Sequence, residues 1–353
     1  MIHVLDLDPR QYNDPAYLEN HGSFSEVAIQ INKSLKKIGY YADPDNAEYV
    51  GICDGLNIGF KYKDKKSFVI SVWETTSLPI FLAQTAKTTN QTIFGLSNQI
   101  TRLWNKYGFP NVKTVYGGTD YEFWTPDINV EKFNQFTFLH INSSNVRSGL
   151  DLTIQSFALA FTGNKNVKLL IKDTNPQDKN SKLLSKINFY KTKYNVDIEY
   201  ISERFNVTQI RDLYRKTHVT LNLLRATSFG MPLLDCSSCG NLCVTGDIEP
   251  TNELINNNGI LIPFDSFVKL SEIVPYLCDE WGLLNCYGNF QHIEEPCIAN
   301  FNVESYAKIL LNIYKNWDKL SKLDIITPIK TNWSWDNSAK NLVSHLYGKI
   351  QNS

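Results

Sequence analysis

Arg225-Ala-Thr-Ser-Phe-Gly-Met-Pro-Leu-Leu-Asp235 is the stretch of sequence that decides the fold. It follows an apolar run, residues 218–224, that indicates a buried strand. It precedes a helical pattern that ends at Gly240 and a second apolar strand at residues 242–245. Strand, glycine-containing turn, helix and strand is the order by which an α/β domain directs backbone N–H groups at an anion. Asp235, one turn into the helix, could accept hydrogen bonds from a sugar diol, so the stretch fits a nucleotide-sugar diphosphate.

Strand and helix patterns alternate along the whole chain, which indicates parallel sheets joined by crossover helices. Strands are expected at residues 2–7, 49–53, 68–73, 92–96 and 112–116, and, after a break at residues 117–126, at residues 136–141, 167–172, 197–201, 218–224, 242–245 and 260–263. The sequence predicts an α/β protein with two doubly wound, Rossmann-like domains facing a cleft. The expected domains are residues 1–130 and 131–330, and residues 331–353 contain a final helix.

The composition is that of a folded protein with little net charge. Among 353 residues, 42% are hydrophobic, 20% are charged, and the net charge is −1. This balance gives no overall electrostatic footprint for nucleic acid. The apolar stretch at residues 1–8 is too short and too acidic for a signal peptide. No apolar run approaches the length of a membrane span. We therefore expect a cytoplasmic protein.

Two residue patterns could hold a metal, and the sequence favours neither as a metal site. Cys236, Cys239 and Cys243 fall on a predicted buried helix and strand and lack a fourth ligand at metal-site spacing. Asp6 and Asp8 have the spacing of a metal-binding carboxylate pair but end the first strand, which is the wrong context. An odd count of seven cysteines without a signal peptide indicates reduced thiols.

The opening stretch resembles the donor-site motif of family 4 (group 1) retaining glycosyltransferases, which have the GT-B fold. That motif has two Glu separated by seven residues, with Gly-Phe/Trp-Gly-x-Pro directly after the first. Residues 229–232, Phe-Gly-Met-Pro, match it. Asp235 replaces the second Glu, which holds the nucleotide ribose, and Thr227 replaces the first, which touches the donor sugar. Looser matches lie at residues 71–79, 97–109, 115–120 and 146–151, and a helix similar to the final one crosses back onto the N-terminal half in the family.

The resemblance implies a nucleotide sugar as co-substrate, with no metal and no other cofactor. Cationic side chains and a helix dipole would then stabilise the departing diphosphate. Arg147 and Lys172 are the candidates, while Ser148 stands where the family usually has Lys. The alternatives are an exposed turn arginine for Arg147 and a charge at a strand end for Lys172.

Further donor contacts are expected around the glycine turn. Backbone N–H groups of residues 228–230, which are Ser228, Phe229 and Gly230, would face the sugar together with Thr227. Gly22, before the first helix, could let the backbone approach the donor phosphates. The alternatives are a helix cap for the Thr227 hydroxyl and a plain turn for Gly22.

Glu74 follows a predicted strand in the first half, where related enzymes place a His that faces the acceptor. A carboxylate there could orient or deprotonate an acceptor hydroxyl. The alternative is a helix N-terminal carboxylate in a surface loop.

Three functional hypotheses follow from these observations. The leading one is a retaining glycosyltransferase that moves a sugar from a nucleotide sugar to an acceptor hydroxyl on a glycan, a small molecule or modified DNA. The second is a GT-B nucleotide-sugar-binding protein that transfers nothing, motivated by Thr227 and Ser148. The third is a phage-type enzyme that glycosylates hydroxymethylated bases in DNA. Lysines at residues 61–66 permit this acceptor, although they are also typical of a solvated face.

Overall fold

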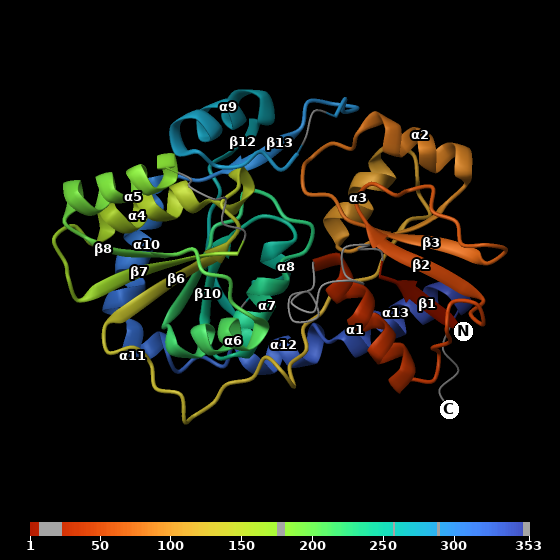
Figure 1. Cartoon of the computed structure of the whole chain (residues 1–353), viewed down its shortest axis with the longest axis horizontal. Helices are drawn as coiled ribbons and strands as arrows, with labels where there is room; N and C mark the ends of the chain where they lie inside the picture. Colours follow the sequence, from red (N-terminus) through yellow and green to blue (C-terminus); the bar gives the residue numbers. More distant parts are fainter. Residues whose placement is uncertain (7–22, 175–180, 257, 288–289, 349–353) are drawn as a thin grey trace. The chain divides into compact units, whose positions relative to one another are not determined.

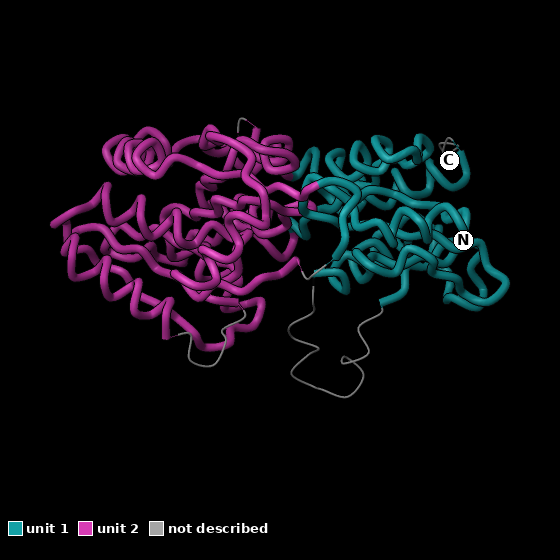
Figure 2. The backbone as a smooth tube through the Cα atoms, turned by 90° about the horizontal axis from the view of Figure 1, so that it is seen from above, with its two compact units in different colours: residues 1–121, 290–294, 330–353 teal, residues 122–289, 295–329 magenta. Residues whose placement is uncertain are grey.

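The computed structural model describes residues 1–6, 23–174, 181–256, 258–287 and 290–348. The chain forms two compact units, coloured separately in Figure 2. Unit 1 contains residues 1–121, 290–294 and 330–353, and unit 2 contains residues 122–289 and 295–329. No helix in the described ranges is both long enough and apolar enough to span a membrane.

Unit 1 is built on a parallel five-stranded sheet whose strands follow one another in chain order. These are β1 (Ile2–Leu5), β2 (Tyr49–Asp54), β3 (Lys66–Ser71), β4 (Thr92–Gly95) and β5 (Lys113–Thr114). Its helices are α1 (Ser23–Lys37), α2 (Ile80–Thr89), α3 (Asn98–Lys106) and α13 (Trp335–Tyr347). Helix α1 buries Val27, Ile31 and Leu35 at helical spacing and packs against β1, β2 and α13.

Unit 2 is built on a parallel six-stranded sheet with the order β11-β10-β9-β6-β7-β8. The strands are β6 (Phe136–Asn142), β7 (Val167–Asp173), β8 (Asp197–Ile201), β9 (Val219–Asn222), β10 (Leu242–Gly246) and β11 (Gly259–Ile262). The chain extends the sheet in one direction from β6 to β8 and then returns to place β9 on the other side of β6. This is the doubly wound, Rossmann-like order.

Helices cover both faces of the unit 2 sheet, as Figure 1 shows. They are α4 (Leu150–Ala160), α5 (Ser181–Tyr194), α6 (Val207–Lys216), α7 (Met231–Ser238), α8 (Thr251–Ile255), α9 (Leu270–Trp281), α10 (Val303–Lys315), α11 (Trp317–Leu320) and α12 (Ile326–Asn332), the last of which runs on into unit 1. Alternate residues of each strand face opposite layers. Phe138 and Leu169 therefore join the buried core with Phe157 of α4.

Each of the eleven predicted strands occurs within two residues of its expected bounds, and the final helix is α13. One ladder was not expected. Strands β12 (Ser266–Lys269) and β13 (Cys297–Asn300) pair in antiparallel fashion and lie beside α9. Their separation in sequence leaves no short hairpin signal for sequence analysis to detect.

Candidate functional site

The reversal of strand order in unit 2 lies between β6 and β9, which are neighbours in the sheet. In open α/β sheets, ligands bind beyond the carboxyl ends of the two strands where the order reverses. The loops that leave those ends are residues 143–149 after β6 and residues 223–230 after β9. They contain Arg147 and Ser148 on one side and residues 227–230 on the other, so the topology brings the two predicted groups to one edge of the sheet.

The two loops are in direct contact. The backbone N–H of Arg225 donates to the carbonyl of Arg147 over 2.8 Å. A Cβ added at Gly149 would lie 1.9 Å from the carbonyl oxygen of Leu223, and Gly149 also has a φ of +68°. Only glycine tolerates both the close approach and this backbone conformation. The glycine of the Arg147-Ser148-Gly149 turn is therefore required by packing between the loops.

A buried ion pair reinforces the contact between the loops. The guanidinium of Arg225 donates two hydrogen bonds of 2.6 Å to the carboxylate of Asp151, at the start of α4. Their side chains are only 2% and 3% exposed. Arg225 also donates to the carbonyl of Val146 over 3.3 Å. Both residues lie in motifs of the family resemblance, but the sequence assigns them no role, because their pairing depends on the strand order.

Asp173 is a third residue to which the sequence assigns no role. It ends β7, is buried, and accepts hydrogen bonds from the backbone N–H and the hydroxyl of Ser144 and from the hydroxyl of Tyr200. Burial and this hydrogen bond raise the pKa of Tyr200, so its hydroxyl stays protonated and donates. The carboxylate of Asp173 thus fixes the beginning of the β6 loop.

The cationic candidates sit at the carboxyl ends of adjacent strands. Arg147 is half-buried in the short 3-10 turn Val146–Ser148. Ser148 is fully buried, and its hydroxyl donates to the carbonyl of Asn145 over 2.8 Å. This bond stabilises the turn itself, so a donor contact of Ser148 remains a prediction.

Lys172 is more deeply buried than a charge at a strand end would be. Its side chain is 1% exposed, and its Nζ donates to the carbonyl of Asp173 over 2.5 Å and lies 4.9 Å from the ring centroid of Phe205. Burial lowers the pKa of Lys172, while Asp173 and Glu203 oppose the shift. The ammonium is held by protein groups, and it would have to leave the Asp173 carbonyl to reach a diphosphate.

The glycine turn after β9 leads directly into α7. Thr227 and Phe229 are buried and Ser228 is half-buried. Gly230 has a φ of +113° and occupies the N-cap position of the helix, where it has no side chain to cap the N-terminus. The N-cap position of α7 is occupied by Gly230 and not by Thr227, and the role of the Thr227 hydroxyl remains a prediction. Asp235 lies one turn into α7 and is half-buried.

Glu74 lies in unit 1, in the loop between β3 and α2, and is half-buried. Because α2 begins only at Ile80, Glu74 is not a helix N-terminal carboxylate. The indole N–H of Trp73 donates to the carbonyl of Ser77 over 2.7 Å and closes this loop. Residues 290–294 run beside the same loop, where Ile80 donates to Gln291 and Ile293 donates to Leu78.

The remaining sequence candidates are placed as follows. Gly22 and Asp8 lie outside the described residues, and Asp6 accepts a 2.6 Å hydrogen bond from the hydroxyl of Ser25. The three clustered cysteines, Cys236, Cys239 and Cys243, are buried thiols. Within the described parts of the chain, no group of three or more His, Cys, Asp or Glu side chains is arranged to hold a metal.

Comparison with known proteins finds similarity in structure only. No protein-family model and no curated protein matches the chain. TarM aligns with a TM-score of 0.62 and 13% identity over 91% of this chain and 58% of TarM. A glycosyltransferase from Rickettsia africae aligns with a TM-score of 0.61 and 13% identity over 95% of this chain and 84% of its own. HepE of Anabaena, in complex with UDP and glucose, aligns with a TM-score of 0.60 and 12% identity over 92% and 83%. The chain has the GT-B fold.

The GT-B likeness extends over both units, since the alignments cover more than nine-tenths of the chain. The chain nevertheless spans only 58% of the length of TarM. At these identities the likeness defines the fold, and any chemistry has to be argued from this chain's own residues.

Proposed function

We propose that this chain is a glycosyltransferase that moves a sugar from a nucleotide-sugar donor to an acceptor hydroxyl. One observation carries the proposal. The loops at the strand-order reversal of a GT-B unit meet beside a glycine turn that leads into a helix N-terminus with Gly230 at its N-cap position. Such a site suits a diphosphate, because the helix dipole and backbone N–H groups favour negative charge.

In this proposal unit 2 binds the donor. Arg147 and Lys172 stabilise the negative charge that develops on the departing diphosphate. Asp235 accepts hydrogen bonds from the ribose hydroxyls, and the backbone of residues 228–230 with Thr227 faces the sugar. Arg225 and Asp151 act as positioning residues, because they fix the two loops without needing to touch the donor.

In the same proposal unit 1 binds the acceptor. Glu74 orients the acceptor hydroxyl or accepts its proton. The bonds that hold its loop, from Trp73 and from residues 290–294, restrict where that carboxylate can lie. We further propose that transfer proceeds with retention, needs no metal, and takes place in the cytoplasm. All seven cysteines are free thiols, which supports a reducing compartment.

Thermal denaturation against UDP, GDP, ADP and their sugar conjugates tests donor binding, because a ligand that binds the native state raises the melting temperature. We expect a shift with one nucleotide and its sugar conjugate, lost in Arg147→Ala and reduced in Asp235→Ala. Lys186→Ala, which removes a partly exposed ion pair with Glu280 and a contact with the Trp281 ring, both outside the donor loops, is the matched control. No shift with any of these ligands would refute the proposal.

Turnover separates the enzyme from a protein that only binds. Release of free nucleotide from the stabilising donor, measured with and without EDTA, should be unaffected by the chelator and lost in Glu74→Gln when acceptor is present. Binding without any release, for every acceptor including hydroxymethylated DNA, would favour a non-transferring binding protein. Residues Thr227 and Ser148, which replace Glu and Lys of the family motif, would then be the first positions to restore.

A further inference from the structure

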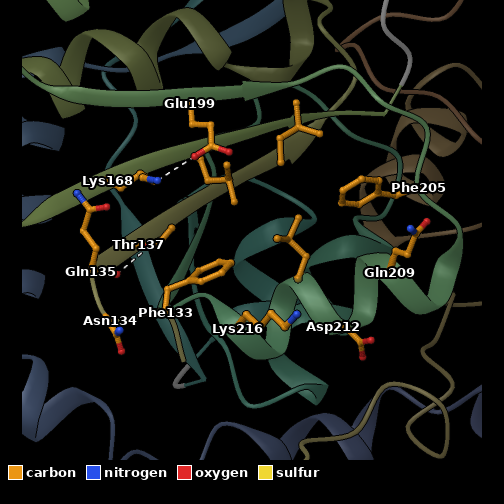
Figure 3. A pocket seen from close by; sticks show the side chains of 13 residues that line it. Phe133, Asn134, Gln135, Thr137, Lys168, Glu199, Phe205, Gln209, Asp212 and Lys216 are labelled. Carbon is orange, nitrogen blue, oxygen red and sulfur yellow. Dashed lines mark hydrogen bonds and ion pairs between the residues drawn. The ribbon is translucent and has the colours of Figure 1, made fainter. Parts of the chain in front are cut away.

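Unit 2 has a cavity of about 520 Å³ over the sheet face opposite α4 (Figure 3). Its floor is formed by side chains of β7 and β8, and its wall by α6 and the segment before β6. The volume lies within the range of roughly 300–1,000 Å³ that is typical of small-molecule sites. The cavity is therefore large enough for a ligand of two or three sugar rings.

This cavity lies mainly at the other end of the strands from the candidate donor site, and Phe205, which also contacts Lys172, is where the two come nearest. Thr137 and Lys168, which line it, are the second residues of β6 and β7. Phe133 precedes β6 altogether. These positions are at the amino ends of the strands, whereas the donor loops leave the carboxyl ends. None of the residues assigned above to donor or acceptor contacts lines the cavity.

The charges that line the cavity balance one another. Lys168 forms a 2.8 Å ion pair with Glu199 on the neighbouring strand. Lys216 and Asp212, both on α6, contribute one charge of each sign. Two cations against two anions leave the lining without a net charge that would favour a phosphate, a nucleic acid or a metal ion. An uncharged ligand is the class that this lining fits.

The uncharged groups of the lining match a carbohydrate. Figure 3 shows the rings of Phe133 and Phe205 reaching the same space from different sides. Asn134, Gln135 and Gln209 add planar amide groups around it. The Gln135 amide nitrogen already donates to Lys165 and Asp197, so Gln135 offers a ligand its amide oxygen. The Gln209 amide oxygen already accepts from the backbone of Asn206, so Gln209 offers its amide N–H groups. A pyranose has an apolar C–H face, which packs on an aromatic ring, and hydroxyls that pair with amides, which both donate and accept. Leu170, on the cavity floor, adds apolar surface.

We propose that this cavity is an accessory carbohydrate site that binds a neutral oligosaccharide, such as a remote part of a glycan acceptor. The proposal rests on the proposed function, since it assigns the acceptor to the glycans. Binding at a second place would hold a chain near the transfer site and raise its effective concentration there. Short acceptors would lack this advantage.

The test uses the full-length protein and three neutral trisaccharides, maltotriose, cellotriose and chitotriose. Saturation-transfer NMR without nucleotide should detect at least one of them. Phe133→Ala and Asn134→Ala should each weaken that binding, by about tenfold for the aromatic ring. Both side chains are exposed, so the variants should keep the melting temperature. Phe267→Ala, an exposed phenylalanine of unit 2 outside the cavity, is the matched control and should bind like the wild type.

The possible outcomes separate this site from the donor site. Absence of binding for all three trisaccharides, or binding that Phe133→Ala and Asn134→Ala leave unchanged, would overturn the accessory site. A nucleotide-induced melting shift that persists in both variants would show that the donor site is intact. Trisaccharide binding that depends on Phe133, in a protein that binds no nucleotide, would keep the carbohydrate site and refute the transferase.

Discussion

Breaking the ion pair between Arg225 and Asp151 should destabilise unit 2 strongly. The two side chains are 2% and 3% exposed and share two hydrogen bonds of 2.6 Å. Removal of one partner leaves the other charge buried and unpaired, which costs about 3–5 kcal/mol in comparable sites. We therefore expect Asp151→Asn to lower the free energy of unfolding of unit 2 by about 3–5 kcal/mol.

Hydrogen exchange in a urea series measures this change for unit 2 alone, because peptides from β6 and β9 report on its sheet. Glu280→Gln is the control, since it breaks an ion pair with Lys186. The side chains of Lys186 and Glu280 are 32% and 56% exposed, and their charged atoms are 3.2 Å apart. A surface pair of this kind contributes about 0–1 kcal/mol. The difference between the two variants isolates the effect of burial.

A double substitution shows whether the charge is responsible. Arg225→Met with Asp151→Leu replaces the pair by apolar side chains, and such replacements of buried ion pairs are often neutral or stabilising. We expect the double variant to recover most of the stability that Asp151→Asn loses. A single variant that loses less than about 1 kcal/mol, or a double variant no more stable than the single one, would refute the reasoning.

Three further predictions concern buried groups of unit 2. Burial lowers the pKa of both His140 and His218 to about 4. Protonation of the unfolded chain should therefore lower the free energy of unfolding as pH drops from about 6.5 to 4, and His140 should account for about 3 kcal/mol of this loss. In His140→Leu the free energy of unfolding should depend less on pH across this range. An unchanged pH dependence would contradict the lowered pKa of His140. Gly149→Ala should lower the free energy of unfolding by well over 1 kcal/mol, because the added Cβ would strike the carbonyl of Leu223. Gly163→Ala is the control, since its Cβ would meet open space and only the φ of +74° would be strained. Equal melting temperatures of the two variants would argue against the contact between the loops. Among the residues that the structure describes, the buried amide of Asn222 has no hydrogen-bond partner. Asn222→Leu should therefore stabilise the fold by about 1–3 kcal/mol in urea unfolding, and a loss of stability would show that the amide is satisfied.

The parallel strands and the loops of the site could be predicted because their signals are local. An apolar run followed by Gly and a helical pattern defines β9, the turn and α7 within about twenty residues. The same reasoning could not pair Arg225 with Asp151, which are 74 residues apart and meet only through the strand order. Nor could it predict that Lys172 is buried against Phe205, since the alternation of apolar residues in a strand does not show which way the side chain at its end points.

Unit 1 is assembled from separate pieces of chain, and this affects how the protein can be made. Helix α13 packs against α1, and the hydroxyl of Tyr49 donates to the carbonyl of Leu346. Residues 290–294 add a further piece from the middle of the chain. During synthesis the sheet of unit 1 emerges first but must wait for almost the whole polypeptide before its helical cover is complete. The sheet of unit 2 lies within residues 136–262 and its core ends at Ile325, so unit 2 can form before α13 is made and while that surface is still open to a chaperone.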